Sequence, residues 1–382
     1  MDREAAAQQV LEQGEAAGFD LCGIAPAAPS RRAAFVRQWI AAGRHGEMHY
    51  LEDNLELRLD PRAMMPGCKS IVAVAMFYGP PEAPPPEVLP PEASPPEAPP
   101  PEAEQAQSQE RRNETPLGEL AKYAADFPGG DYHKVMKRRL HAMADALRET
   151  LAGDWRACVD TAPVLEREHA AAAGLGWIGK HTLLIHPRRG SWMALGVLLT
   201  TVDLATSEQL NFPGDLVPDA DHCGTCTRCI DACPTAAITP YSVDASRCIS
   251  YLTIEHRSAI DPALEPPMGS WLAGCDVCQV VCPHPRKKHF VELNMSAPPA
   301  AHGRWLDLLQ VLGWSAADRQ AALRGSALKR IKLDMWKRNA LIALGNRPLD
   351  AATRQRIEAV ASDAEEAEMV RATARRVLAR SA

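Results

Sequence analysis

The spacing of the cysteines constrains this chain more than any other feature. Cys223, Cys226, Cys229 and Cys233 are separated by two, two and three residues, and Pro234 follows the last of them. In iron–sulfur runs with this spacing, one tight loop supplies three ligands of a cubane [4Fe–4S] cluster and the fourth cysteine ligates the other cluster of a pair. The run therefore predicts two clusters.

A second array supplies the remaining ligands. Cys275, Cys278 and Cys282 are separated by two and three residues and end at Pro283, and Cys248 stands in for the missing first member. Exchange of the fourth cysteine between the clusters predicts two sets of four ligands. The first set is Cys223, Cys226, Cys229 and Cys282, and the second set is Cys248, Cys275, Cys278 and Cys233.

Zinc is the alternative interpretation, because Cys-x2-Cys pairs also build tetrahedral structural zinc sites. Zinc leaves the x2, x2, x3 spacing and both Cys-Pro endings unexplained, so the iron–sulfur interpretation is preferred. Cys22, Cys68 and Cys158 stand alone in the sequence. Free cysteine is among the most buried residue types, so these three are expected in the core.

Length and composition place the chain among multidomain proteins of a reducing compartment. Its 382 residues suffice for two or three domains. It has no uninterrupted apolar run of about 18 residues, and it begins without the basic and apolar regions of a signal peptide. Its 11 cysteines cluster at short spacings, which indicates metal ligation rather than a disulfide scaffold. A cytoplasmic protein without a membrane segment is expected.

Charge is distributed unevenly along the chain. From Arg286 to Ala382 there are 18 lysines and arginines against 10 aspartates and glutamates, whereas the whole chain carries a net charge of −6. A basic terminal domain suggests a polyanionic partner, and an ordinary solvated helical surface is the alternative.

The order of elements predicts an α+β multidomain fold. Residues 1–203 are typical of an α/β domain, residues 204–290 hold the cysteine arrays, and residues 291–382 are typical of stacked helix pairs in a short α-solenoid. Pro80–Glu102 contains 12 prolines and five glutamates. Such a density favours extended polyproline II, so residues 80–110 are expected to be a disordered insert within the first domain.

Hydrophobic periodicity locates the main elements. Helices are expected at Arg3–Ala17, Arg31–Ala42, Tyr132–Leu151 and Pro163–Gly174, and in the tail at Arg304–Leu312, Ala316–Arg324, Leu328–Leu344 and Leu349–Ser381. Strands are expected at Ile71–Tyr78, Trp155–Asp160, Thr182–His186 and Trp192–Val202. The first of these strands is apolar almost throughout, which indicates burial on both faces.

Asp160 is the main candidate for chemistry outside the cysteine arrays. Because all eight array cysteines are committed to iron, the reaction must take place in the α/β domain. Asp160 ends a strand before a helix, and it serves there either as an acid or as the helix N-cap. The glycine-rich segment Gly174–Lys180 follows a helix and precedes a strand, which is the wrong order for a nucleotide-binding loop. A loop that brings its backbone and Lys180 close to a large cofactor fits better.

Segments along nearly the whole chain resemble the epoxyqueuosine reductases, a family of cobalamin-dependent iron–sulfur enzymes of tRNA modification. Their combination is highly specific. The matching segments are Gly18–Asp20 with Cys22–Pro26, His45–Leu51, Arg58–Arg62 with Pro66–Gly67, Asp131–Lys134, Asp160–Arg167, Gly174–Lys180, Cys248–Glu255, and Lys329–Ile331 with Arg338–Asn346.

The resemblance implies reduction of epoxyqueuosine to queuosine at the wobble position, 34, of tRNAs with GUN anticodons, the last step of queuosine biosynthesis. It also implies a cobalamin-binding α/β domain, a ferredoxin-like domain with two [4Fe–4S] clusters and a HEAT-like helical tail that binds tRNA. Cobalamin is inferred from the resemblance alone. The cofactor contacts that the resemblance implies are Arg58, Asp160, Lys180, Ser250 and Asp276.

For such a reaction Asp160 is the expected catalytic acid. Converting an epoxide to an alkene requires two electrons, a nucleophile or reductant at carbon and a proton for the departing oxygen. The clusters can pass electrons from an external low-potential donor, a reduced cobalt can attack carbon, and Asp160 can donate the proton. Burial against the corrin is expected to raise the pKa of Asp160 far enough for protonation near neutral pH.

A basic stripe in the tail is the candidate tRNA-binding surface. Six lysines and arginines lie between residues 324 and 338 around Trp336, and Arg286–Lys288 can extend the stripe. Phosphate contact and base stacking require cations beside an aromatic ring, although Trp336 by itself is better explained as the core of a helix pair. The stripe comprises Arg324, Lys329, Arg330, Lys332, Lys337 and Arg338, and the expected tRNA contacts are Lys329, Arg330, Lys332 and Arg338.

Two other functions stay open. A reductive dehalogenase-like enzyme shares cobalamin and two clusters, but it predicts no basic helical tail and usually an export signal. An electron-transfer iron–sulfur protein without its own substrate leaves the α/β and helical regions without a role. The chain is expected to act as a monomer.

Overall fold

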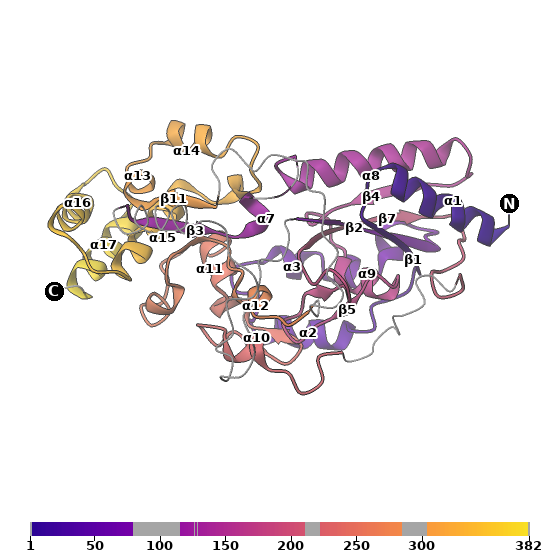
Figure 1. The fold of residues 1–382 in the computed structure, drawn as a ribbon, viewed down its shortest axis with the longest axis horizontal. Helices are drawn as coiled ribbons and strands as arrows, with labels where there is room; N and C mark the ends of the chain where they lie inside the picture. Colours follow the sequence, from indigo (N-terminus) through magenta and orange to yellow (C-terminus); the bar gives the residue numbers. More distant parts are fainter. Residues whose placement is uncertain are drawn as a thin grey trace, which may run out of the picture. The chain divides into compact units, whose positions relative to one another are not determined.

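The computed structural model describes residues 2–78, 115–125, 127, 129–210, 222–284 and 304–380 (Figure 1). The chain forms two compact units. The first unit comprises residues 1–80, 122–248 and 277–300, and the second unit comprises residues 81–121, 249–276 and 301–382. These limits do not coincide with the expected boundaries at 203 and 290. The expected insert at 80–110 and the basic residues Arg286–Lys288 lie outside the described residues.

A four-stranded antiparallel sheet forms the centre of the first unit. Its order is β1-β2-β7-β4. β2 pairs with both of its neighbours and all of its residues are buried, which confirms the expected strand with two buried faces. The strands are β1 (Leu21–Pro26), β2 (Ser70–Phe77), β7 (Met193–Thr200) and β4 (Trp155–Cys158).

Successive side chains of a strand point to opposite faces of its sheet, so alternate residues of β2 pack in two different cores. Val72 and Val74 pack in a core that includes residues of α1 (Arg3–Ala16) and α8 (Tyr132–Arg148), and Figure 1 shows these two helices over the sheet. The intervening residues of β2 pack in a second core with α9 (Glu166–Ala172). The first unit is therefore a sheet between two layers, with α8 and α9 on opposite faces.

The three isolated cysteines belong to these cores. Cys68 and Cys158 are buried in the core that contains α9, and Cys22 packs against the core that contains α8. Their expected role as core residues is confirmed.

Short elements complete the first unit. They are α2 (Ala33–Ala41), α3 (Tyr50–Asp53), α4 (Leu55–Leu59), α5 (Pro61–Met64), α7 (Lys122–Ala125) and the hairpin of β5 (Trp177–Ile178) and β6 (Leu184–Ile185). The cysteine-rich segments add α10 (Arg228–Asp231), β8 (Ile238–Thr239), β9 (Ser242–Val243), η1 (Ala245–Arg247) and α12 (Val277–Val280).

The second unit contains a three-stranded sheet and most of the tail helices. β3 (Leu117–Leu120) pairs in parallel with β10 (Trp271–Ala273) and antiparallel with β11 (Trp305–Asp307). Among the helices, α15 packs against α13 and α17, and α17 packs against α16. The helices are α11 (Ile249–Ile254), η2 (Pro266–Met268), α13 (Leu308–Leu312), α14 (Ala316–Ala322), η4 (Ala327–Arg330), α15 (Leu333–Gly345), α16 (Ala351–Ser362) and α17 (Glu368–Arg380).

Four expected helices differ in the structure. Leu328–Leu344 is divided into η4 and α15, because Ile331 is extended. Arg304–Leu312 starts as strand β11, because its backbone pairs with β3, and only then becomes helical. Leu349–Ser381 is two helices, since Asp363 ends α16 in an extended conformation. The helix expected from Pro163 begins at Glu166. In the parts of the chain that the structure describes, no helix combines the length and apolar character needed to cross a bilayer.

Candidate functional site

Asp160 lies in an unusual turn directly after the sheet. Its φ is +37°, in the left-handed region that few residues other than glycine, asparagine and aspartate adopt. Its side chain is 47% exposed. Helix α9 begins six residues later, with Leu165 as its N-cap residue. The alternative role of Asp160 as the helix N-cap is therefore wrong.

Asp160 is one end of a chain of three hydrogen-bonded side chains. His133 Nε2 lies 3.0 Å from Asp160 Oδ2, and His133 Nδ1 lies 2.9 Å from Asp131 Oδ1. Asp131 is the N-cap residue of α8 and also accepts a hydrogen bond from the backbone N–H of His133 at 3.1 Å. The ring of Tyr132 stacks on the ring of His133, with centroids 3.8 Å apart. The imidazole is thus fixed between two carboxylates.

This arrangement favours a positively charged His133. Burial of the ring lowers the pKa of His133, but the hydrogen bonds to Asp160 and Asp131 raise it by more, so that it lies above its ordinary value. An imidazolium in contact with Asp160 is a proton source for that carboxylate. In the sequence, Asp131–Lys134 is one of the segments that resemble the family, but no role is predicted for His133. Its hydrogen-bond partner Asp160 is 27 residues away, so their contact is not evident from the sequence.

Further ionisable groups surround Asp160. Burial raises the pKa of Glu166 to about 7, and the negative charge of Asp160 adds to this rise. Burial lowers the pKa of Arg58, although the negative charges of Glu166 and Asp160 oppose that effect. Arg58 Nε and Glu166 Oε1 are buried without a hydrogen-bond partner among the described residues. Arg58, an expected cofactor contact, therefore lies near Asp160 and brings an unsatisfied donor.

The thiols of the first predicted ligand set lie together in the first unit. Burial raises the pKa of Cys282 to about 11, and the negative charges of Cys223, Cys229 and Cys226 add to this rise. Helix α10, which carries Cys229, packs against α12, which precedes Cys282. Four neighbouring thiols are the type of donor set that a [4Fe–4S] cluster requires, and iron would replace their protons on binding. The assignment of these four cysteines to one cluster stays a prediction.

The second predicted ligand set is distributed over both units. Cys233 Sγ accepts a hydrogen bond from the backbone N–H of Ala237 at 3.3 Å. Arg247 Nε donates to the carbonyl of Thr235 at 3.0 Å, which ties the chain after Cys233 to the chain before Cys248. Cys278 belongs to α12 of the first unit, whereas Cys275 belongs to the second unit. This set stays a prediction.

The other expected cofactor contacts occupy different places. Lys180 Nζ donates to the carbonyls of Gly224 at 2.5 Å and Cys226 at 3.1 Å, so it contacts the loop of the first ligand set. In the second unit Ser250 belongs to α11, and the buried Asp276 lies 3.7 Å from Arg304. Contact of Lys180, Ser250 or Asp276 with cobalamin stays a prediction.

The basic stripe is split between surface and interior. Arg324, Lys329, Arg330 and Lys332 are exposed, and Arg330 also forms an ion pair with Glu255 at 2.8 Å. Lys337 is paired with Glu366. Three of the four expected tRNA contacts are therefore accessible from solvent.

Arg338 and Trp336 correct the predicted stripe. Arg338 is fully buried and donates to the carbonyls of Leu252, His256 and Ser258 at 2.6–2.7 Å. Trp336 is also fully buried, with its ring 5.5 Å from that of Trp314. Neither can reach a tRNA, so the expected Arg338 contact is wrong and Trp336 is a core residue.

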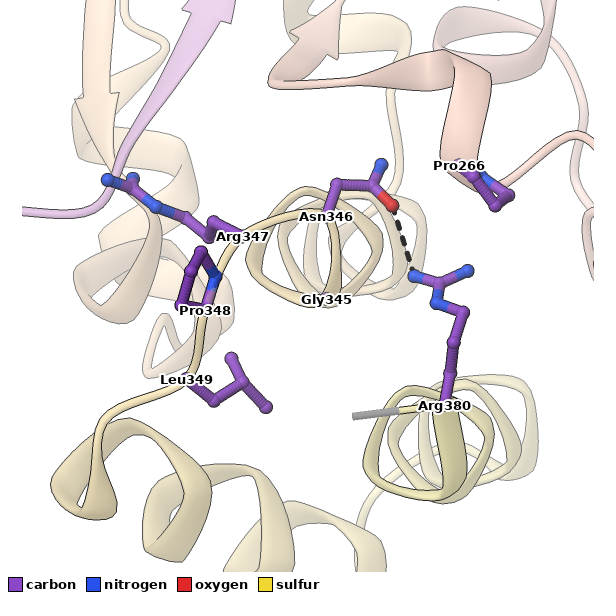
Figure 2. A pocket seen from close by; sticks show the side chains of 7 residues that line it. All are labelled: Pro266, Gly345, Asn346, Arg347, Pro348, Leu349 and Arg380. Atoms are coloured by element: carbon purple, nitrogen blue, oxygen red, sulfur yellow. Dashed lines mark hydrogen bonds between the residues drawn. The ribbon is translucent and has the colours of Figure 1, made fainter. Parts of the chain in front are cut away.

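A pocket of about 460 Å³ lies at the end of α15 in the second unit (Figure 2). Arg380 Nη2 donates to Asn346 Oδ1 at 3.1 Å across it, and Arg380 also pairs with the buried Glu265 at 3.2 Å. The charge of Arg380 is therefore largely neutralised, and no residue of the Asp160 site lines this pocket. Its lining is Pro266, Gly345, Asn346, Arg347, Pro348, Leu349 and Arg380.

Two family models match parts of the chain. Residues 58–161 match the family described as Epoxyqueuosine reductase QueG, DUF1730, and this range contains Arg58, His133 and Asp160. Residues 222–285 match a 4Fe-4S double cluster binding domain, and this range contains all eight array cysteines.

Proteins named epoxyqueuosine reductase are similar to nearly the whole chain. The protein of Shewanella oneidensis is 36% identical over 373 residues, which cover 96% of this chain and 86% of that protein. The protein of Synechococcus sp. is 38% identical over 347 residues, with coverages of 88% and 92%. The protein of Escherichia coli is 33% identical over 353 residues, with coverages of 92% and 83%.

Solved structures share the fold. An epoxyqueuosine reductase crystallised with an epoxyqueuosine-modified tRNA-Tyr stem loop has a TM-score of 0.78 at 24% identity, covering 98% of this chain and 89% of that chain. The enzyme of Streptococcus thermophilus gives a TM-score of 0.78 at 24% identity, with coverages of 98% and 90%. In a Bacillus subtilis structure with a TM-score of 0.76, 24% identity and coverages of 98% and 89%, the catalytic aspartate loop is swung out of the active site.

Proposed function

Because the chain belongs to the epoxyqueuosine reductase family, we propose that it reduces epoxyqueuosine to queuosine at the wobble position, 34, of tRNAs with GUN anticodons, with Asp160 as the catalytic acid. The observation that carries the role of Asp160 is its hydrogen bond to His133, which in turn is held by Asp131. The proposed reaction is the last step of queuosine biosynthesis, and because its substrate is tRNA we propose that the protein acts in the cytoplasm.

The residues present are compatible with the two kinds of cofactor that the family implies. Four thiols converge in the first ligand set, which supports a [4Fe–4S] cluster held by Cys223, Cys226, Cys229 and Cys282. Near Asp160, the buried Arg58 Nε and Glu166 Oε1 lack partners among the described residues, and a corrin carries amide groups that can satisfy both a donor and an acceptor. When bound, cobalamin supplies the strongly reducing nucleophile for the epoxide carbon, with electrons from the clusters and an external low-potential donor.

The proton balance of the reaction explains why one acid is not enough. Removal of an epoxide oxygen as water leaves an alkene and consumes two electrons and two protons. Asp160, half exposed at the end of β4, is placed to give the first proton to the departing oxygen. His133, whose pKa lies above its ordinary value because of its bonds to both carboxylates, can then return a proton to Asp160. Asp131 orients the ring and stabilises its positive charge.

A tRNA partner is supported by the second unit. Lys329, Arg330 and Lys332 are exposed close together at η4 and the start of α15. Cations so placed bind phosphates without reading sequence. A structure of the same fold holds a modified tRNA stem loop, which agrees with this use of the fold.

One experiment tests the proposal directly. Reconstituted protein is incubated with cobalamin, a low-potential reductant and epoxyqueuosine-containing tRNA, and the nucleosides are analysed by mass spectrometry. Queuosine should form only in the complete mixture. Clusters that reduce normally without any queuosine would favour an electron-transfer protein, and turnover of organohalides in place of the tRNA would favour a dehalogenase-like enzyme.

A further inference from the structure

The glycine-rich segment Gly174–Lys180 is built as a tight hairpin. A Cβ atom at Gly176 would lie 2.4 Å from the carbonyl oxygen of Ile185, and a Cβ atom at Gly179 would lie 2.4 Å from Ile185 Cδ1. At Gly176 the collision is with backbone, so the pairing of β5 with β6 requires glycine there, whereas at Gly179 the side chain of the buried Ile185 would have to shift. The glycines therefore serve the hairpin, and the functional side chains of this segment are Trp177 and Lys180.

Lys180 holds the ligand loop of the first cluster. Its ammonium donates to the carbonyls of Gly224 and Cys226, which lie inside the Cys223–Cys226 turn. An ammonium bonded to two carbonyls fixes the conformation of that turn and keeps a positive charge beside it.

Trp177 lies against the same ligand set from the first strand of the hairpin. Its ring centroid is 4.6 Å from that of His222 and 5.0 Å from that of His284. His222 directly precedes Cys223, and His284 is two residues after Cys282. The residue is 5% exposed, and its indole Nε1 has no hydrogen-bond partner among the described residues. A buried indole N–H without an acceptor is costly, and this one lies beside two histidines that flank predicted cluster ligands, so an acceptor on the cluster would satisfy it.

We propose that Trp177 and Lys180 tune the first cluster: the indole N–H donates a hydrogen bond to a sulfur of the cluster, and Lys180 locks the ligand loop and contributes positive charge. This inference rests on the two-cluster assignment of the proposed function and is independent of its RNA substrate. Reduction adds negative charge to a cluster, and both a hydrogen bond to sulfur and a nearby cation stabilise that charge. Trp177 and Lys180 are thus positioning residues that make the first cluster easier to reduce than it would otherwise be.

The test is a redox titration of the full chain, reconstituted anaerobically without cobalamin or tRNA and followed by electron paramagnetic resonance. Trp177→Phe keeps an aromatic side chain but removes the N–H, so one cluster should become at least about tenfold harder to reduce, equivalent to a potential lower by about 59 mV for one electron. The other cluster should be unchanged. A Cys226→Ser variant, which alters the ligands of the first cluster, identifies which signal belongs to it.

Matched control variants distinguish a specific change in the reduction potential of the first cluster from general damage to the protein. Trp155→Phe removes another buried indole N–H without a described partner, but in the core of the sheet, and should leave both potentials as they are. Lys180→Met should lower the potential of the same cluster as Trp177→Phe, and Lys180→Arg should restore it. Lys137→Met, which removes an exposed charge from α8, should have no effect.

The outcomes decide the proposal in each case. A Trp177→Phe protein with wild-type potentials, or one whose two clusters shift equally, overturns it. If Lys180→Met loses half of its iron while Trp177→Phe keeps wild-type potentials, Lys180 is needed only for assembly of the cluster. That result also overturns the tuning role. A wild-type protein that binds metal without sulfide would instead overturn the two-cluster assignment itself.

Discussion

His133 Nε2 lies 3.0 Å from Asp160 Oδ2, and this contact joins the first turn of α8 to the end of β4. Because the opposite nitrogen of the same ring is held by Asp131 at 2.9 Å, the imidazole that contacts Asp160 is fixed in orientation, and its hydrogen bonds to both carboxylates raise the pKa of His133 above its ordinary value. The proton supply to Asp160 therefore depends on His133, which acts on the substrate only through Asp160.

Asp160→Asn should abolish turnover without disturbing the fold. Asparagine tolerates the left-handed backbone conformation of this position, but it cannot release a proton. Queuosine formation in a single turnover should fall by at least ~10²–10⁴-fold, the contribution of a positioned general acid. Iron content and tRNA affinity should stay normal. Asp154→Asn, at an exposed turn, is the matched control and should be fully active; near-normal activity of the Asp160 variant would contradict the assignment.

The reaction rate should decrease at alkaline pH because His133 must be protonated to resupply Asp160. The pKa of His133 is raised above its ordinary value of about 6.5, so the imidazolium is fully present below that pH and is lost as the pH rises through the raised pKa. The check is the single-turnover rate from about pH 6 to pH 9 at saturating tRNA. His133→Asn should be slower and should lose this alkaline decrease.

Glu166 is the control for that pH profile. Burial raises the pKa of Glu166 to about 7, so this carboxyl titrates in the same range. Glu166→Gln should keep the alkaline decrease if His133 causes it. If the alkaline decrease in rate disappears in Glu166→Gln and persists in His133→Asn, then Glu166 and not His133 is the group whose titration causes it.

Removal of the exposed cations at η4 should weaken tRNA binding through counterion release. Alanine at Lys329, Arg330 and Lys332 should lower affinity and reduce the slope of log affinity against log salt by about 0.7–0.9 for each phosphate that is no longer neutralised. Filter binding at several salt concentrations measures both quantities. Replacing Arg371 and Arg375 together should lower tRNA affinity less, because both are paired with Glu368. If the two sets of substitutions lower the affinity equally, the tRNA is bound by nonspecific charge attraction.

Replacement of Arg338 should reduce stability and leave tRNA binding intact. Arg338→Met leaves one buried and two partly buried carbonyls without their donor, which should lower the free energy of unfolding by about 3 kcal/mol. Arg338→Lys should rescue little, because an ammonium does not reproduce the planar guanidinium geometry. Urea titration measures the decrease, and tRNA affinity measured on the folded protein should equal that of the wild type.

Metal analysis should find about eight iron and about eight sulfide per chain after anaerobic reconstitution. Serine at Cys282, a member of the convergent thiol set, should destabilise one cluster and leave the other, so that the spectrum of a single cluster remains. About two zinc ions per chain without sulfide would support the alternative interpretation of the same cysteines.

Local patterns predicted those parts of the molecule that depend on neighbouring residues. The period of α8 and the apolar run of β2 are imposed by burial, so the sequence alone located both to within a few residues. The cysteine runs were recognisable because a cubane cluster dictates short spacings, and the thiols of the first set do lie together.

Features that depend on distant partners could not be found in this way. The run Arg304–Leu312 has helical periodicity, but its first residues pair with β3, which is about 185 residues earlier and was not expected as a strand. Arg338 has the same chemistry as its exposed neighbours, and only the position of three carbonyls in the folded chain makes it a core residue. His133 became a site residue only when α8 was packed on the sheet.

The way in which the chain passes between the two units limits how this enzyme can be divided. Each unit is assembled from three separate stretches, so the polypeptide crosses from one to the other several times. β3 depends on β10 and β11, which follow it by more than 150 residues, and neither unit exists as a contiguous piece of the gene. A tail expressed from residue 291 onwards would lack two of the three strands of its sheet. The second unit can therefore be completed only after almost the whole chain has been synthesised, and no single proteolytic cut can release it intact.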